Sequence, residues 1–208
     1  MKYKAVFFDL DGTLMDTSEG IFACGRYAMD KAGLPFPELE NPNTFIGPPL
    51  ADCFRVVLGV KDEQKVEALC HYYHDSYMEK GRFMARFYPG ILAVLQILKD
   101  RGYRLGIASM KNEDLVRQMC SHFKVASYFD VQLGIDLMGT MTKADLILQG
   151  CRSLGIEPGE CVLVGDTPID EKGAKDAGCG MIRANWGFGF TKEDPGTISS
   201  PYEIPDLV

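Results

Sequence analysis

The chain has 208 residues, of which 46% are hydrophobic and 25% are charged, and its formal net charge is −7. These values are typical of a soluble globular protein that can bury a sizeable core, as one domain or two small ones. The negative charge without any run of Lys or Arg argues against a nucleic-acid polymer as partner, and no stretch reaches the ~18 apolar residues of a membrane span.

Cysteine and histidine usage indicates neither a disulfide framework nor a zinc site. The seven cysteines include no CxxC pair, which indicates reduced thiols. His71 and His74 lack a Cys or His partner at zinc-like spacing, so we interpret them as surface or packing residues of a helix. The first residues, MKYKAVFFDLDG, lack the apolar core and cleavage site of a signal peptide. We therefore expect a cytoplasmic protein that does not contact membranes.

The first predicted element is a strand at residues 3–9, which is apolar with almost no alternation. Such a pattern is typical of a parallel strand that is covered on both faces. A long and mostly helical stretch follows from about 16 to 86. We expect a first helix that ends near Gly33 and further helices at 49–58 and 62–80.

After Tyr88 the pattern changes to an alternation of helices and strands. We predict helices between Pro89 and Gly102, from Asn112, at about 142–154 and at about 168–177, and strands at 104–109, 129–134, 161–165 and 179–184. Strands that alternate with helical patterns of this length indicate βαβ units and a parallel sheet. The simplest architecture is an α/β domain whose first strand is followed by a helical insertion of roughly 70 residues.

Polar residues stand at the ends of the predicted strands, where open parallel sheets bind their ligands. The apolar runs end in Asp9, Ser109 and Asp166, and Asp11 and Asp170 follow closely. A single carboxylate at such a place is usually a helix N-cap, but four on one rim repel one another. Two carboxylates ~4 Å apart repel by about 4 kcal/mol at an effective dielectric constant of 20. A bound hard cation relieves this repulsion, and oxygen ligands select Mg²⁺ or Ca²⁺ over zinc.

Four segments occur in a characteristic order: FDLDGT, the Ser that ends IAS, the Lys of TKADLI, and GDTPID. Together they resemble the four motifs of the haloacid dehalogenase (HAD) superfamily. The resemblance implies a HAD-like α/β fold, a three-layer Rossmann-type core with a parallel sheet, at residues 1–15 and 87–208, with an inserted α-helical cap at 16–86. FIGPPL and the late WGFG extend the likeness to the branch of phosphoglycolate-phosphatase-like and 5′-nucleotidase-like proteins.

The resemblance also implies a role for each motif residue. Asp9 is implied to be the nucleophile that forms an aspartyl-phosphate, and Asp11 the general acid and base. The implied phosphate-binding residues are Gly12, Ser109, Met110 and Lys143. The implied Mg²⁺ ligands are the Asp9 carboxylate, the Asp11 backbone carbonyl and Asp166, with Asp170 supporting the site.

The chemistry of these residue types agrees with the implied roles. A carboxylate nucleophile divides one phosphoryl displacement into two easier steps. Mg²⁺ and the ammonium of Lys143 neutralise charge on the phosphoryl group. Gly12 permits a tight turn whose amides face the phosphate. Met110 departs from the usual polar residue of the branch and offers only its backbone N–H to the phosphate.

The helical insertion is implied to close over the site, exclude water and select the substrate. The candidate specificity residues in it are Phe45, Ile46, Gly47 and Pro48, for which a rigid turn without substrate contact is the alternative. We interpret Arg82 and Arg86 as solvated side chains in preference to ligands of a second anionic group.

We therefore expect a Mg²⁺-dependent phosphatase that hydrolyses a small-molecule phosphomonoester. A nucleoside monophosphate, phosphoglycolate or a sugar phosphate are candidates, and Ala144, where phosphoglycolate phosphatases commonly have proline, weakens the second. One alternative is a phosphomutase of the β-phosphoglucomutase type, which returns the phosphoryl group to the substrate. Another is a non-catalytic protein of this fold that binds a metal or a partner, which the complete set of core motif residues disfavours.

Overall fold

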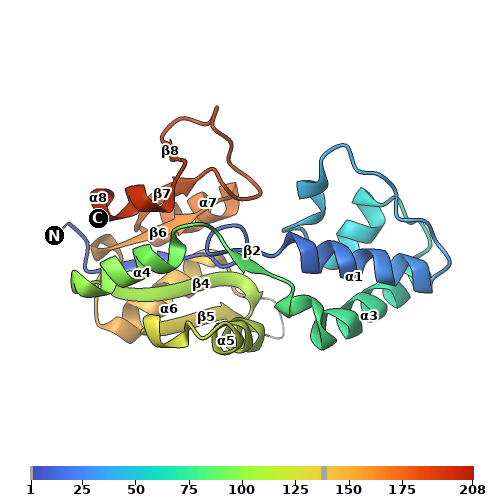
Figure 1. The fold of residues 1–208 in the computed structure, drawn as a ribbon, viewed down its shortest axis with the longest axis horizontal. Coiled ribbons are helices and arrows are strands. Elements are labelled where there is room, and N and C mark those ends of the chain that lie inside the picture. The colour runs from blue at the N-terminus through green and yellow to red at the C-terminus, as the bar shows by residue number, and fades with distance from the viewer. Residues whose placement is uncertain (1, 137–139) are drawn as a thin grey trace. The chain divides into compact units, whose positions relative to one another are not determined.

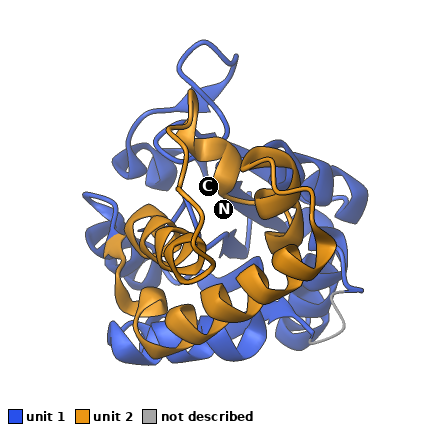
Figure 2. Ribbon diagram, turned by 90° about the vertical axis from the view of Figure 1, so that its right-hand side faces the viewer, with its two compact units in different colours: residues 1–16, 87–208 blue, residues 17–86 orange. Residues whose placement is uncertain are grey.

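The computed structural model describes residues 2–136 and 140–208, and the chain divides into two compact units. Unit 1 comprises Met1–Asp16 and Phe87–Val208, and unit 2 comprises Thr17–Arg86; Figure 2 draws them in blue and orange. The chain passes between the units at two short strands, β2 (Met15–Asp16) and β3 (Arg86–Phe87).

Unit 1 is built on a six-stranded sheet with the order β5-β4-β1-β6-β7-β8, in which neighbouring strands pair in parallel (Figure 1). Its strands are β1 (Ala5–Phe8), β4 (Arg104–Asn112), β5 (Val131–Ile135), β6 (Cys161–Gly165), β7 (Gly180–Ala184) and β8 (Thr197–Ile198). All four residues of β1 are buried, which explains its continuous apolar run. The predicted α/β fold with a parallel sheet is confirmed.

Helices cover both faces of this sheet. They are α4 (Ile91–Asp100), α5 (Glu113–His122), α6 (Lys143–Leu154), α7 (Pro168–Ala177) and the short α8 (Ile204–Leu207), with 3₁₀ turns at Ala126–Tyr128, Pro158–Glu160 and Pro201–Glu203. Figure 1 shows α4 in front of the sheet and α6 behind it. On the face of α6 and α7, the ring of Phe7 lies so close to Gly106 and Gly150 that a Cβ at either glycine would be 2.4 Å from it. The layers therefore pack without space for even one more methyl group at these points.

Capping boxes mark the first residues of two helices, α6 and α7. Thr142 and Asp145 form a capping box at the start of α6, and Thr167 and Asp170 form another at the start of α7. Each box satisfies two backbone N–H groups that the first turn leaves without helical partners. The boxes therefore fix the positions of Lys143, the first residue of α6, and of Asp170.

The observed strands differ from the predicted ones mainly at the edges of the sheet. The strands predicted at 161–165 and 179–184 correspond to β6 and β7. The strand predicted at 104–109 continues to Asn112, because pairing with β5 resumes at Asn112 after a register shift that begins at Ser109. β8 is absent from the predicted strands, since a two-residue strand leaves too short a pattern to read.

Apart from Arg86 in β3, the regular elements of unit 2 are helices and helical turns. Its elements are α1 (Ser18–Lys31), a 3₁₀ turn at Pro42–Phe45, α2 (Leu50–Asp52), a π-helical turn at Cys53–Val57, α3 (Glu63–Glu79) and a 3₁₀ turn at Gly81–Phe83. Phe45, Phe54 and Leu69 are central members of its hydrophobic core. His71 and His74 are exposed on α3.

Two further features agree with the composition of the chain. All seven cysteines are free thiols. Within the described ranges, every helix is too short or too polar to cross a lipid bilayer.

Asp130 connects the edge strand β5 to its neighbour β4. Its backbone N–H donates to Leu105 O, and its carboxylate accepts from Leu105 N–H, both at 2.8 Å. The carboxylate also lies 2.9 Å from Arg104 Nε and 3.6 Å from Lys99 Nζ. Burial acts to raise the pKa of Asp130, but the Leu105 N–H and the two cations together outweigh it, so the pKa lies below its ordinary value.

We expect Asp130→Asn to lower the free energy of unfolding by about 1–3 kcal/mol at pH 7, because it removes charge-assisted contacts. Since the folded pKa is depressed, this contribution is present above about pH 4, the ordinary pKa of an unfolded Asp, and is lost as the pH falls through the folded value. Urea unfolding between pH 7 and about pH 3.5 tests this, and the difference from wild type should narrow toward the acid end.

The control is Asp100→Asn, which removes an exposed carboxylate that accepts a hydrogen bond from Gln96 on the same helix. It should change the free energy of unfolding by no more than about 0.5 kcal/mol. Equal losses in the two variants would contradict the role assigned to Asp130.

Candidate active site

Three buried carboxylates meet at the carboxyl ends of β1 and β6. Asp9 directly follows β1, Asp166 directly follows β6, and Asp170 lies in the first turn of α7. One oxygen of each carboxylate lies within 4.8 Å of the other two. The fold thus brings together residues that are far apart in the chain, because parallel strands end at the same edge of a sheet.

The ammonium of Lys143 lies between two of these carboxylates. It donates hydrogen bonds to Asp9 Oδ1 and to the Ala108 carbonyl oxygen, each at 2.8 Å, and it lies 2.8 Å from Asp170 Oδ1. Two of the three N–H donors of the ammonium are used in these hydrogen bonds, and the contact with Asp170 is an ion pair. Burial opposes the charged form of Lys143, but the charges of Asp9 and Asp170 outweigh burial and raise its pKa.

The position of Lys143 also depends on a glycine of α7. A Cβ at Gly173 would lie 2.4 Å from Lys143 Cγ. Because α6 and α7 pack together there, only a residue without a side chain lets the stem of Lys143 pass beside the helix toward the carboxylates.

Negative charge is in excess at this site. We call Asp9, Asp166 and Asp170 the three-carboxylate group. Three carboxylates face one ammonium, which leaves two charges unbalanced. Burial, together with the charge of Asp9, raises the pKa of Asp166 to about 7. Burial also raises the pKa of Asp9 to about 6, although Lys143 opposes this. An all-oxygen site with two charges to balance fits a hard divalent cation such as Mg²⁺ or Ca²⁺.

The carboxylate of Asp166 is oriented through both of its oxygens. Thr13 Oγ1 donates to Oδ1 and the Phe188 N–H donates to Oδ2, each at 2.8 Å. The Phe190 N–H donates to the Asp166 carbonyl oxygen at 2.7 Å, and Trp186 Nε1 donates to the Thr13 carbonyl oxygen at 3.1 Å. The WGFG segment therefore connects the loop after β1 to Asp166.

Glycines permit this close approach. A Cβ at Gly12 would lie 2.2 Å from Asp166 Oδ2, and Gly12 has a φ of +85°, a conformation that favours glycine. A Cβ at Gly187 would lie 2.3 Å from both Asp166 Oδ2 and the Gly12 carbonyl oxygen. Neither residue can carry a side chain without movement of Asp166 or the backbone.

Asp11 is paired with a different lysine. Lys111 Nζ lies 2.8 Å from Asp11 Oδ2 and 3.1 Å from Oδ1, and the Lys111 side chain is 9% exposed. Lys111 stands in the irregular end of β4, between Ser109 and Asn112. The loop after β1 therefore presents two carboxylates, Asp9 and Asp11, and each has its own ammonium.

Ser109 and Met110, the predicted phosphate-binding residues of β4, lie near the carboxyl end of that strand, as Lys111 does. Ser109 is buried, and its Oγ accepts a hydrogen bond from the Lys111 N–H at 3.3 Å. Met110 is exposed. Both belong to the stretch in which the pairing of β4 with β5 shifts register.

Several residues that contact this site are absent from the predicted set. They are Lys111, Thr13 and the backbone of residues 186–190. The available signals were the position of Lys111 two residues after Ser109, the Thr of FDLDGT, and the glycines of WGFG. None of these signals identifies the residue that is contacted, because the contacts join segments that only the sheet brings together.

The predicted specificity residues belong to unit 2. Phe45 is 2% exposed and packs against three other rings at centroid distances of 5.7 to 6.0 Å. Its partners are Phe22, Phe36 and Phe54. Its ring lies in the core of the unit, which favours the alternative of a rigid turn for Phe45. Ile46 is partly buried, and Gly47 and Pro48 are exposed.

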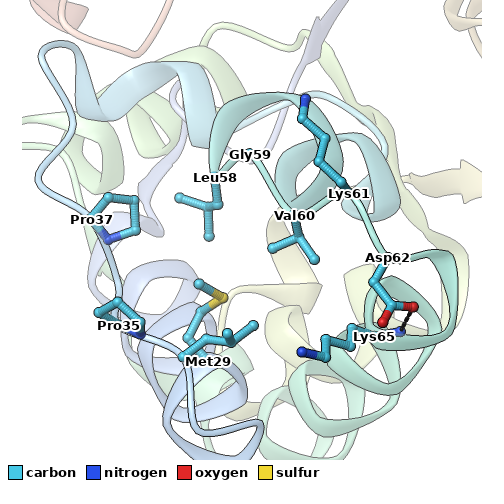
Figure 3. A pocket seen from close by; sticks show the side chains of 10 residues that line it. Met29, Pro35, Pro37, Leu58, Gly59, Val60, Lys61, Asp62 and Lys65 are labelled. Atoms are coloured by element: carbon cyan, nitrogen blue, oxygen red, sulfur yellow. Dashed lines mark hydrogen bonds between the residues drawn. The ribbon is translucent and has the colours of Figure 1, made fainter.

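Unit 2 also contains a cavity of ≈ 420 Å³ (Figure 3). Apolar side chains such as Met29, Leu58 and Val60 line it, and Lys61 and Lys65 add charge. Its lining includes no member of the three-carboxylate group, so we assign no phosphate chemistry to this cavity.

The chain is similar to known proteins in sequence and in structure. The family model described as haloacid dehalogenase-like hydrolase matches residues 6–184. A 5′-nucleotidase of Pseudomonas aeruginosa is 34% identical over 194 residues, which cover 93% of this chain and 87% of that protein. A phosphoglycolate phosphatase of Aquifex aeolicus is 30% identical over 208 residues, which cover 99% and 96% of the two chains. The solved structure of a haloacid dehalogenase-like hydrolase from Streptococcus pneumoniae has a TM-score of 0.88 at 29% identity and covers 99% of this chain and 98% of that one.

We expect Gly187→Ala to lower the free energy of unfolding by about 1–3 kcal/mol, because the new methyl group must displace Asp166 or the Gly12 backbone. The matched control is Gly159→Ala, where a Cβ meets nothing within 4 Å, and we expect no loss there beyond about 0.5 kcal/mol. Urea unfolding of the two variants measures the difference. Similar stabilities would show that the WGFG segment does not pack against Asp166 as tightly as described.

Proposed function

This chain belongs to the haloacid dehalogenase-like hydrolase family and is a phosphatase, and we propose that it is a Mg²⁺-dependent enzyme that hydrolyses a small phosphomonoester through an aspartyl-phosphate on Asp9. The observation that carries the proposal is the buried group of Asp9, Asp166 and Asp170, in which one ammonium contacts Asp9 and Asp170 and two negative charges are left to balance. The relatives named as a 5′-nucleotidase and a phosphoglycolate phosphatase support the reaction class.

In the first proposed step, a carboxylate oxygen of Asp9 forms a bond to phosphorus, and the bond from phosphorus to the ester oxygen breaks. Asp11 gives its proton to that oxygen as it leaves. In the second step, Asp11 takes a proton from water, the water oxygen bonds to phosphorus, and the bond to Asp9 breaks. The products are an alcohol and inorganic phosphate, and both carboxyl groups return to their starting states.

The other residues position these groups and the phosphate. Lys143 orients Asp9 through the 2.8 Å hydrogen bond and supplies positive charge beside the phosphoryl group. We assign the phosphoryl oxygens to the Ser109 hydroxyl and the backbone amides of Gly12 and Met110. The exposed side chain of Met110 is compatible with a contact made only by its backbone.

The metal would be held by the carboxylates of Asp9 and Asp166 and by the backbone carbonyl of Asp11. When bound, Mg²⁺ supplies positive charge to the phosphoryl group and to the carboxylates around it. Asp170 fits a supporting role, because its Oδ2 accepts hydrogen bonds from Thr167 and its Oδ1 lies against Lys143.

We further propose that unit 1 is the catalytic core and that unit 2 is a cap that selects the substrate and limits the access of water. Ile46, Gly47 and Pro48 remain the proposed substrate contacts in the cap. The candidate substrates are a nucleoside monophosphate, phosphoglycolate and a sugar phosphate, and the free thiols favour a cytoplasmic setting.

Replacement of the nucleophile tests the chemistry. With Mg²⁺ and para-nitrophenyl phosphate, we expect Asp9→Asn to lower kcat by at least about 1000-fold, because the covalent route is lost. The control Asp100→Asn should keep wild-type turnover. The release of inorganic phosphate, measured together with the absence of isomerised sugar phosphates, separates hydrolysis from phosphoryl return. Wild-type turnover by Asp9→Asn would refute the proposed nucleophile.

Metal binding is tested independently of turnover by thermal unfolding. Mg²⁺ at about 100 times its Kd should raise Tm by about 5–10 °C, since ligand binding at that ratio stabilises the folded state by about 2.7 kcal/mol. Asp166→Asn should lose most of this increase because it removes a charged ligand. Asp11→Asn should keep most of it, because its proposed metal contact is a backbone carbonyl. An equal increase in wild type and Asp166→Asn would contradict the metal site.

A further inference from the structure

We infer that Lys111 is a positioning residue, which holds the Asp11 carboxylate at the place where it exchanges a proton with the leaving group. The inference rests on the proposed function and adds a residue to the same site. Lys111 and Asp11 are separated by 100 residues in the chain, and the ammonium lies within hydrogen-bond distance of both carboxylate oxygens, at 2.8 and 3.1 Å.

The backbone of Lys111 is anchored on both sides. Its N–H donates to Ser109 Oγ at 3.3 Å, and the next residue, Asn112, caps α5 by accepting hydrogen bonds from the backbone N–H groups of Asp114 and Leu115. Gly134 of β5 approaches from the side, where a Cβ would lie 2.4 Å from the Lys111 carbonyl oxygen. The ammonium is therefore carried by a backbone that has little freedom to move.

Asp11 has a greater need of such a partner than Asp9. The side chain of Asp11 is 22% exposed, whereas that of Asp9 is 11% exposed and is held by Lys143. A partly exposed Asp can populate several rotamers, and proton transfer requires a separation of about 2.6–3.2 Å between donor and acceptor. A low-exposure ammonium that engages both oxygens restricts the carboxylate to one position.

The two lysines thus contact different carboxylates at this edge of the sheet. Lys143 contacts Asp9 and Asp170 and also donates to the Ala108 carbonyl oxygen. Lys111 serves Asp11. The competing role for Lys111 is a direct contact with the phosphoryl group, and that role would affect every phosphate ester to the same extent.

Two aryl phosphates of similar shape distinguish the roles. The para-nitrophenolate group leaves without a proton, whereas phenolate is a stronger base and departs better when an acid protonates it. We expect Lys111→Met to reduce kcat/KM for phenyl phosphate at least ~10-fold more than for para-nitrophenyl phosphate, because general acid catalysis contributes about 10²–10⁴-fold where it is needed. The value of kcat/KM is used because it reports the first step, in which the ester bond breaks.

Further variants test whether the effect of Lys111→Met arises through Asp11. Lys111→Arg keeps a cation and should show a smaller differential loss than Lys111→Met. In an Asp11→Asn background, Lys111→Met should add little to the differential loss, because the group that it positions is already inactive. Inhibition by inorganic phosphate should change less than ~3-fold in Lys111→Met. Lys192→Met removes an exposed lysine and should behave as wild type.

Three outcomes would overturn the inference: equal losses on both esters, a matching loss of phosphate inhibition, or a full additional loss in the Asp11→Asn background. If Lys111→Met does not fold, as judged by its thermal unfolding, Lys111→Gln, which also removes the charge, carries the same comparison, and an equal loss on both esters would again overturn the inference. Failure of the wild-type enzyme to hydrolyse either ester would refute the proposed function itself, and the inference with it.

Discussion

Unit 1 depends on the contacts of the buried Lys143 ammonium with two carboxylates. Without it, Asp9 and Asp170 would be two carboxylates in contact with little solvent, and their repulsion would favour protonation or separation. The ammonium donates hydrogen bonds to Asp9 and to the carbonyl oxygen of Ala108 on β4, and it forms an ion pair with Asp170. Lys143 thus connects α6 to three other parts of the fold, namely the loop after β1, strand β4 and helix α7.

This arrangement holds the carboxylates in fixed positions and also leaves negative charge that a cation could balance. Both oxygens of Asp166 accept hydrogen bonds, and Asp170 accepts one from Thr167 and forms an ion pair with Lys143, so both carboxylates are held in place. The raised pKa values of Asp9 and Asp166 mark the cost of assembling so much negative charge in a buried place. A divalent cation bound there would remove that cost, and its charge would also be available to a phosphoryl group. The excess negative charge of the buried carboxylates therefore bears both on the stability of the fold and on the proposed chemistry.

Much of the architecture and part of the site could be predicted from the sequence, for physical reasons that differ between elements. The strand that precedes Asp9 was recognisable because a strand buried on both faces has no polar alternation, and the position of Asp166 followed in the same way from the strand before it. The short β8 and the last part of β4 were not recognisable, since they carry polar or very few residues. Lys111 and Thr13 were missed because their partners, Asp11 and Asp166, stand 100 and 153 residues away. For Phe45 the sequence left substrate contact and a rigid turn as alternatives, because a turn motif does not reveal which side chains face a core.

The sequence by itself determined the alternation of helices and strands and the kinds of chemical group that stand at the strand ends. These follow from local patterns, in which hydrophobic periodicity and capping residues act over one or two turns. Only the tertiary structure decided which ammonium faces which carboxylate, how the WGFG segment orients Asp166, and how much charge the buried group retains. Pairing, burial and pKa are properties of distances between segments, and the parallel sheet sets those distances when it aligns its strand ends.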